Sequence, residues 1–74
     1  MAKVVIHNRI RRLRFDCGEM TQAALAARVG CTRQTIVLLE QQRYAPSLAL
    51  ALKIAHVFGQ KVDDIFRLDC ADDR

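Results

Sequence analysis

The segment "TQAALAARVGCTRQTIVLLE", residues 21–40, decides how this chain folds. Thr21 and Thr32 each stand at the start of a stretch with helical apolar spacing, where a threonine side chain is suited to cap a helix. Gly30 can take the left-handed conformation that ends the first helix, only two residues before the second cap. Two short helices joined by such a tight turn form a helix-turn-helix motif, which is predicted over about residues 21–41.

The flanking sequence extends this motif into a larger helical domain. Asn8 and Ser47 are suited to cap further helices that begin at about residues 9 and 48, and the acidic pair in "VDDIF" favours one more helical turn. The β-branched "VVI" and the alternating "FRLDC" indicate small strands near the two ends. We therefore expect an all-α fold of five helices with short terminal β-strands. It forms a single domain over residues 1–74 that ends in a short acidic tail at 69–74.

Apolar periodicity predicts which side of each helix is buried. In the first helix, Ile10, Leu13 and Cys17 recur on one face. In the fourth helix, the expected core residues are Leu48, Leu52, Ala55, Val57 and Phe58. Cys17 and Cys31 are interpreted as small buried apolar residues, whereas Cys70 lies in the tail, where exposure is expected.

Composition limits the class of protein. The chain has 74 residues, of which 51% are apolar, so it forms one small core that a second subunit would help to complete. Three cysteines do not make a disulfide framework, and no Cys or His spacing predicts a metal or cofactor site. No apolar run approaches the roughly 20 residues that a membrane helix needs. A cytoplasmic protein is therefore expected.

Charge is distributed unevenly along the chain. Residues 1–62 contain ten Lys/Arg and three Asp/Glu, a net charge of +7, while residues 63–74 contain two Arg and five Asp, a net charge of −3. A basic body favours an anionic partner, with nucleic acid first. Four arginines on predicted helices are either phosphate contacts or part of a solvated face, and both interpretations stay open: Arg9, Arg11, Arg12 and Arg28.

The predicted helix over residues 33–41 has more apolar residues than one face can bury. On a helical projection, Ile36 and Leu39 point to the core with Glu40 beside them. The opposite side carries three other residues: Gln34, Leu38 and Gln41. A groove-facing Leu38 would contact a thymine methyl while Gln34 bonds adenine N6 and N7. The alternative is that Leu38 packs on a neighbouring helix.

Several short motifs follow one another in a fixed order between residues 9 and 66: "TQ", "LA", "VG", "RQTI", "LE", "PSL" and "DDIF". With this ordered set the chain resembles the XRE family, the Cro and phage-repressor-like helix-turn-helix regulators, and above all its small stand-alone dimeric members. The resemblance implies a five-helix, lambda-repressor-like DNA-binding domain whose third helix enters the major groove. It also implies an ion pair between Arg14 and Glu40. Many members carry Asn or Gly where this chain has Gln42.

The resemblance also implies a set of residues that contact double-stranded DNA: Gln22, Arg33, Gln34, Thr35, Arg43 and Tyr44. Among these, Arg43 is the expected backbone contact in the turn after the third helix. Thr32 joins the set because of its position, since the free N–H groups at the start of a helix attract phosphate.

Two functions fit these features. The first is a sequence-specific DNA-binding transcriptional regulator, a repressor that binds a palindromic operator as a homodimer. The second is the DNA-binding antitoxin of a toxin–antitoxin pair, with a toxin as its protein partner. No catalytic constellation is visible in the sequence, so an enzyme is not expected.

The strand at 4–6 is expected to pair with about 67–70, beside a dimer interface made by Val62, Ile65, Phe66 and Leu68.

Overall fold

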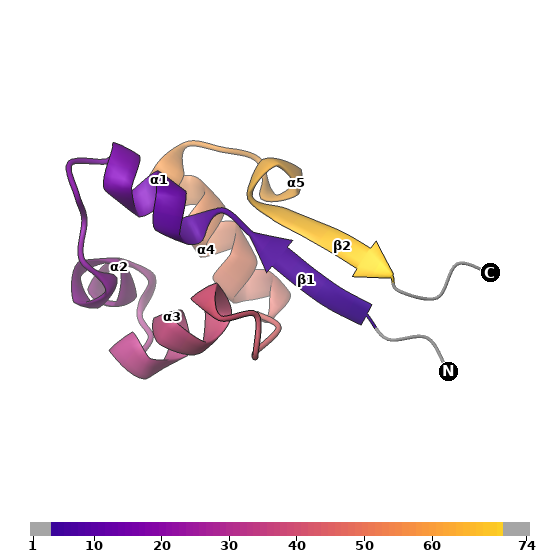
Figure 1. Cartoon of the computed structure of the whole chain (residues 1–74). Helices are drawn as coiled ribbons and strands as arrows, with labels where there is room; N and C mark the ends of the chain where they lie inside the picture. The colour runs from indigo at the N-terminus through magenta and orange to yellow at the C-terminus, as the bar shows by residue number, and fades with distance from the viewer. Residues whose placement is uncertain (1–3, 71–74) are drawn as a thin grey trace.

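The computed structural model describes residues 4–70, and at residues 4, 69 and 70 it describes the backbone alone. The elements follow in the order β1 (Val4–Asn8), α1 (Ile10–Asp16), α2 (Gln22–Val29), α3 (Arg33–Glu40), α4 (Leu48–Phe58), α5 (Val62–Ile65) and β2 (Phe66–Cys70) (Figure 1). This order confirms the helical fold with short strands near its ends. The acidic tail beyond residue 70 and the side chain of Cys70 lie outside the described residues. Within residues 4–70, no helix is long and apolar enough to cross a bilayer.

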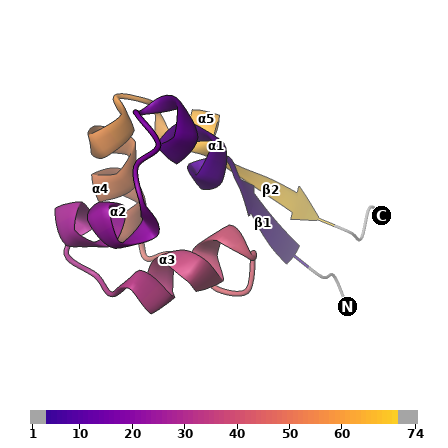
Figure 2. The ribbon, with the colours of Figure 1, turned by 60° about the vertical axis from the view of Figure 1, so that its left-hand side comes forward.

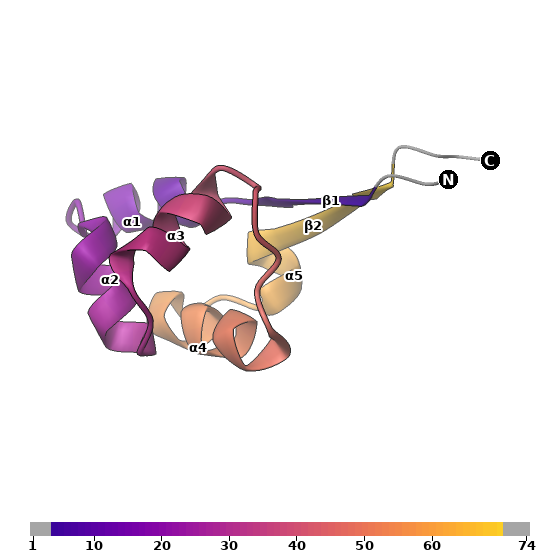
Figure 3. The same ribbon diagram turned by 90° about the horizontal axis from the view of Figure 1, so that it is seen from below.

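The two strands form an antiparallel ribbon. Ile6 lies opposite Leu68, and Asn8 lies opposite Phe66. The ribbon projects to one side of the helical body, so that the first and last described residues lie together at its far end (Figures 1 and 3). The predicted pairing of the two terminal segments is confirmed.

Three helices begin at the capping residues that the sequence predicts. The side-chain oxygen of Thr21 accepts a hydrogen bond from the backbone N–H of Ala24 at 3.0 Å, and Ser47 accepts one from Leu50 at 3.1 Å. Thr32 caps α3 in the same way. Gly30, with a φ of 75°, ends α2 in the left-handed conformation. Figure 2 shows how the turn after Gly30 places α3 along one edge of the helical body.

One hydrophobic core joins all five helices. Each helix contributes at least one of the fully buried side chains, which are Ile10, Leu25, Ile36, Leu39, Ile54 and Ile65. Because Ile65 is only 2% exposed within a single chain, it has no surface left for a second copy. Its assignment to a dimer interface is therefore wrong.

The predicted core face of α4 is wrong at two positions. Leu48 is 73% exposed and Leu52 is 52% exposed. The buried residues of α4 are instead Leu50, Ala51, Ile54 and Ala55. Its sequence is apolar on nearly all sides, so periodicity alone permits more than one face. Packing against the rest of the domain, with α2 among the neighbours of α4, selects the face that is buried.

The two cysteines within the helical body differ in their surroundings. Cys17 is exposed, contrary to the prediction, because α1 ends at Asp16 and the chain turns away before Cys17 can join the buried face. Cys31 is half-buried and packs against the core, as expected. Burial raises the pKa of the Cys31 thiol, and the positive charge of Lys53 opposes this effect in part.

Candidate nucleic-acid interface

Helix α3 has one side in the core and the other side open. Ile36 and Leu39 are 0% and 1% exposed and fix the helix to the rest of the domain. Arg33 and Gln34 are exposed. Leu38 is half-buried, yet it is not among the described apolar residues that pack against the core. The four-residue apolar run therefore divides between packing and an outward surface.

The first turn of α3 is held by two threonines. Thr32 Oγ1 accepts from the backbone N–H of Thr35 at 3.2 Å, and the two hydroxyl oxygens lie 3.0 Å apart. These contacts use the hydroxyls locally and keep the start of the helix in register. The side chains of Arg33 and Gln34 make no hydrogen bond or ion pair within residues 4–70, so they are free to meet a ligand at this positive end of the helix.

The turn after α3 has a defined backbone geometry. The N–H groups of Gln42 and Arg43 donate to the carbonyls of Leu39 and Leu38 at 3.0 and 2.9 Å. Gln42 has a φ of 62°, in the left-handed region. This is the Schellman arrangement that ends many helices. It places the exposed Arg43 directly beside the end of α3, followed by Tyr44, which is 45% exposed.

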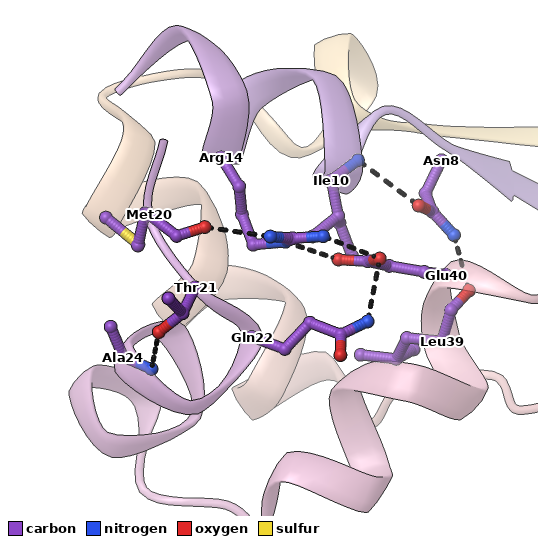
Figure 4. A network of polar contacts seen from close by, with 9 residues as sticks. All are labelled: Asn8, Ile10, Arg14, Met20, Thr21, Gln22, Ala24, Leu39 and Glu40. Carbon is purple, nitrogen blue, oxygen red and sulfur yellow. Dashed lines mark hydrogen bonds and ion pairs between the residues drawn. The ribbon is translucent and has the colours of Figure 1, made fainter. Parts of the chain in front are cut away.

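A polar network joins α1, α2 and α3 (Figure 4). Arg14 donates from Nε to Glu40 Oε2 at 2.6 Å and from Nη2 to Glu40 Oε1 at 2.9 Å, so the expected ion pair is present in a two-pronged geometry. Arg14 Nη1 also donates to the Met20 carbonyl at 2.8 Å. The side chains of Arg14 and Glu40 are 14% and 9% exposed, which makes this a largely desolvated pair.

Gln22 belongs to the same network. Its Nε2 donates to Glu40 Oε1 at 3.2 Å, and its side chain is only half-buried. Its amide oxygen and second N–H make no hydrogen bond in the described part of the chain. Gln22 is therefore oriented by the ion pair beside α3, with hydrogen-bonding capacity left for a ligand.

Asn8 makes a contact that the sequence did not predict. Its Oδ1 accepts from the Ile10 N–H at 3.2 Å, but Asn8 is not the cap of α1. The capping position is Arg9, whose side chain makes no capping bond, so the predicted cap is wrong by one residue. Its Nδ2 donates to the Leu39 carbonyl at 2.7 Å. One side chain thus ties the base of the ribbon to the last turn of α3 (Figure 4). A spacing of 31 residues gives no signal in the sequence.

A helix-turn-helix whose second helix is fixed by its apolar side and leaves basic and amide side chains open has the architecture of a DNA-binding domain. Within residues 4–70 there is no cluster of His, Cys, Asp and Glu that could hold a metal ion. Residues 18–65 match the helix-turn-helix family. The chain therefore belongs to the helix-turn-helix family, in the XRE type that its sequence resembles.

Relatives agree with this assignment, and a solved structure shares the fold. The chain is 50% identical over 64 residues to an uncharacterized HTH-type transcriptional regulator of Archaeoglobus fulgidus, covering 86% of this chain and 90% of that protein. It is 54% identical over 61 residues to another uncharacterized regulator of this type from Methanothermobacter thermautotrophicus, covering 81% and 87%. A crystal structure of a candidate DNA-binding protein from Bacteroides fragilis has the same fold, with a TM-score of 0.72 at 22% identity. The match covers 84% of this chain and 98% of that one.

Proposed function

We propose that the protein is a sequence-specific transcriptional regulator that represses by occupying a palindromic operator as a homodimer. The observation that carries this proposal is the division of α3. Ile36 and Leu39 hold one side in the core, while Gln34 is exposed on the opposite side and Arg33 is exposed at the start of the helix. A rigidly held helix with free polar side chains at its N-terminal end is what major-groove recognition requires.

Base recognition is assigned to the first half of α3 and to Leu38. Gln34 can bond adenine N6 and N7 with both groups of its amide, and Leu38 lies one helical turn later on the same side, where it can contact a thymine methyl. Arg33 can bond a guanine or a phosphate, because both lie within reach of the start of a helix in the groove. Thr35 is occupied with Thr32 and supports this end of the helix.

Phosphate contacts are assigned to the ends of the motif. Arg43 and Tyr44 follow the fixed turn after α3 and are exposed. Gln22 stands beside α3 at the start of α2, held by Glu40. Contacts on both sides of a recognition helix set its depth and register in the groove without reading the sequence themselves.

The dimer is assigned to the ribbon. Phe66 and Leu68 lie on one face of β2, because side chains two residues apart in a strand share a face. Phe66 packs against the core, whereas Leu68 is 66% exposed, beside its half-buried cross-strand neighbour Ile6. The apolar face that begins in the core thus continues outward along the ribbon. A second copy would cover it, together with the open parts of Phe66 and Val62.

Selection of bound sequences from random duplex DNA tests this function. We expect a near-palindrome with half-sites about 10 base pairs apart, the spacing of two recognition helices about 34–36 Å apart.

Gln34→Ala should relax the preference at one base pair in each half-site by about 1–3 kcal/mol. Arg43→Ala should instead weaken binding to all sequences. It should also reduce the slope of log affinity against log salt by about 0.9, the value for one phosphate contact. Selection that returns no enriched sequence would overturn the proposal.

A further inference from the structure

A surface hollow of about 350 Å³ lies where α1, α2 and α3 meet, and its lining joins residues far apart in the sequence. The lining residues are Arg11, Arg14, Gln22, Val37, Glu40 and Gln41. Val37 belongs to α3 and Gln41 directly follows it, so the hollow opens beside the surface assigned to the DNA groove. Arg11 is brought to this place from α1.

We propose that Arg11 binds a phosphate of the DNA backbone at the edge of the groove that α3 enters. This inference rests on the proposed function, and it adds a contact from α1 to a recognition surface otherwise built from α2, α3 and the turn after them. It also resolves an ambiguity of the sequence, in which four helical arginines were equivalent.

The structure separates these four arginines by their partners. Arg9 Nη1 donates to the Asp64 carbonyl at 3.1 Å. Arg12 forms an ion pair with Asp16 at 3.3 Å on the exposed side of α1. Arg28 is exposed in the last turn of α2 and does not line the hollow. Arg11 alone of the four both lines the hollow and makes no hydrogen bond or ion pair in the described part of the chain.

The charge of the hollow favours an anion. Arg11 and Arg14 are three residues apart and therefore share a face of α1. The carboxylate of Glu40 is engaged on both oxygens by Arg14. The positive charge of Arg11 is thus uncompensated within the hollow. Gln22 and Gln41 provide amide groups around it that can also donate to a phosphate oxygen.

The dimensions of the double helix place a phosphate near this position. A helix with its side chains is about 10–12 Å across, and the major groove is about 12 Å wide. A helix seated in the groove therefore has a sugar–phosphate backbone close along each side. A cation on the element next to α3 meets that backbone and not the bases, so Arg11 should add affinity without sequence preference.

Two neighbouring arginines give a matched experiment. Arg11→Gln and Arg12→Gln remove the same charge from adjacent positions of the full chain, and both side chains are exposed. Binding to the selected operator is measured over a series of salt concentrations. We expect Arg11→Gln to reduce the slope of log affinity against log salt by about 0.9 and to weaken binding about five- to tenfold at 0.1 M salt. Arg12→Gln should keep the wild-type slope.

A further variant and two further measurements test the role of Arg11 independently of the proposed function on which it rests. Arg11→Lys should restore the wild-type slope, because a single positive charge suffices for a phosphate contact. The base preference selected by Arg11→Gln should match that of the wild type. An unchanged slope in Arg11→Gln, or an equal loss of operator affinity in Arg11→Gln and Arg12→Gln, would overturn the assignment of Arg11. The proposed function would stand in that case, because the wild type would still bind its operator. A wild type that binds no duplex DNA would overturn the proposed function as well.

Discussion

At the residue scale, the left-handed backbone of Gln42 offers a test of the turn that positions Arg43. A non-glycine residue in this region costs about 1–2 kcal/mol. Glycine avoids this cost, but its greater freedom in the unfolded chain offsets part of the gain in stability. Gln42→Gly should therefore raise the free energy of unfolding by about 0.5–1 kcal/mol in thermal melting. Gln41→Gly is the control, because Gln41 has an ordinary φ of −84°. It should destabilise the protein, and a gain there would contradict the explanation.

Leu38 and Leu39 are adjacent residues with opposite expected roles. Leu39 is 1% exposed, so Leu39→Ala should cost about 2–5 kcal/mol of stability. Leu38 is half-buried and outside the core, so Leu38→Ala should cost about 1 kcal/mol or less and should weaken binding at a thymine position. Thermal melting and operator binding of both variants decide whether Leu38 contacts DNA bases or packs in the core. Equal melting losses would place Leu38 in the core.

At the element scale, the pair between Arg14 and Glu40 holds α3 against α1. Glu40→Ala leaves the guanidinium of Arg14 largely desolvated and without its carboxylate, which should cost about 3 kcal/mol. The control is Asp16→Ala, which breaks the exposed pair with Arg12 and should cost about 0.5 kcal/mol or less. Chemical denaturation measures both values. Similar losses in the two variants would show that the inner pair contributes no more than a surface one.

Replacing both partners of this inner pair separates charge burial from packing. In Arg14→Met/Glu40→Leu no buried charge is left unpaired, so a large part of the stability lost in Glu40→Ala should return. Gln22 loses its hydrogen bond to Glu40 in both variants. If operator binding stays weak in the double variant after stability returns, the network acts on DNA binding by orienting Gln22 and not only by supporting the fold.

At the scale of the whole molecule, the proposed dimer depends on the ribbon. Leu68→Asp should convert the dimer to a species with the chain mass of 8.4 kDa in light scattering at micromolar concentration. It should leave melting of the single chain nearly unchanged, because Leu68 is exposed. Leu52→Asp is the control, since it places the same charge on an exposed leucine of α4 and should leave the dimer intact. A wild-type protein that is monomeric under these conditions would contradict the dimer.

The sequence by itself determined the elements and their order. Thr21, Thr32 and Ser47 each bond to a backbone N–H three residues later, so the signal for a helix start lies within a few residues and can be read locally. The same holds for the left-handed glycine that ends α2. The ion pair between Arg14 and Glu40 was also anticipated, through the resemblance to a family and not through any local rule.

Only the tertiary structure decided which surfaces are covered. It buried the face of α4 that carries Leu50 and Ile54 and left Leu48 and Leu52 exposed, because an apolar helix has no preferred side until a neighbour packs against it. It also joined Asn8 to the Leu39 carbonyl and brought Arg11 beside α3. These relations connect residues about 30 positions apart. Nothing local to either residue encodes them, since their distance is set by the packing of the helices between them.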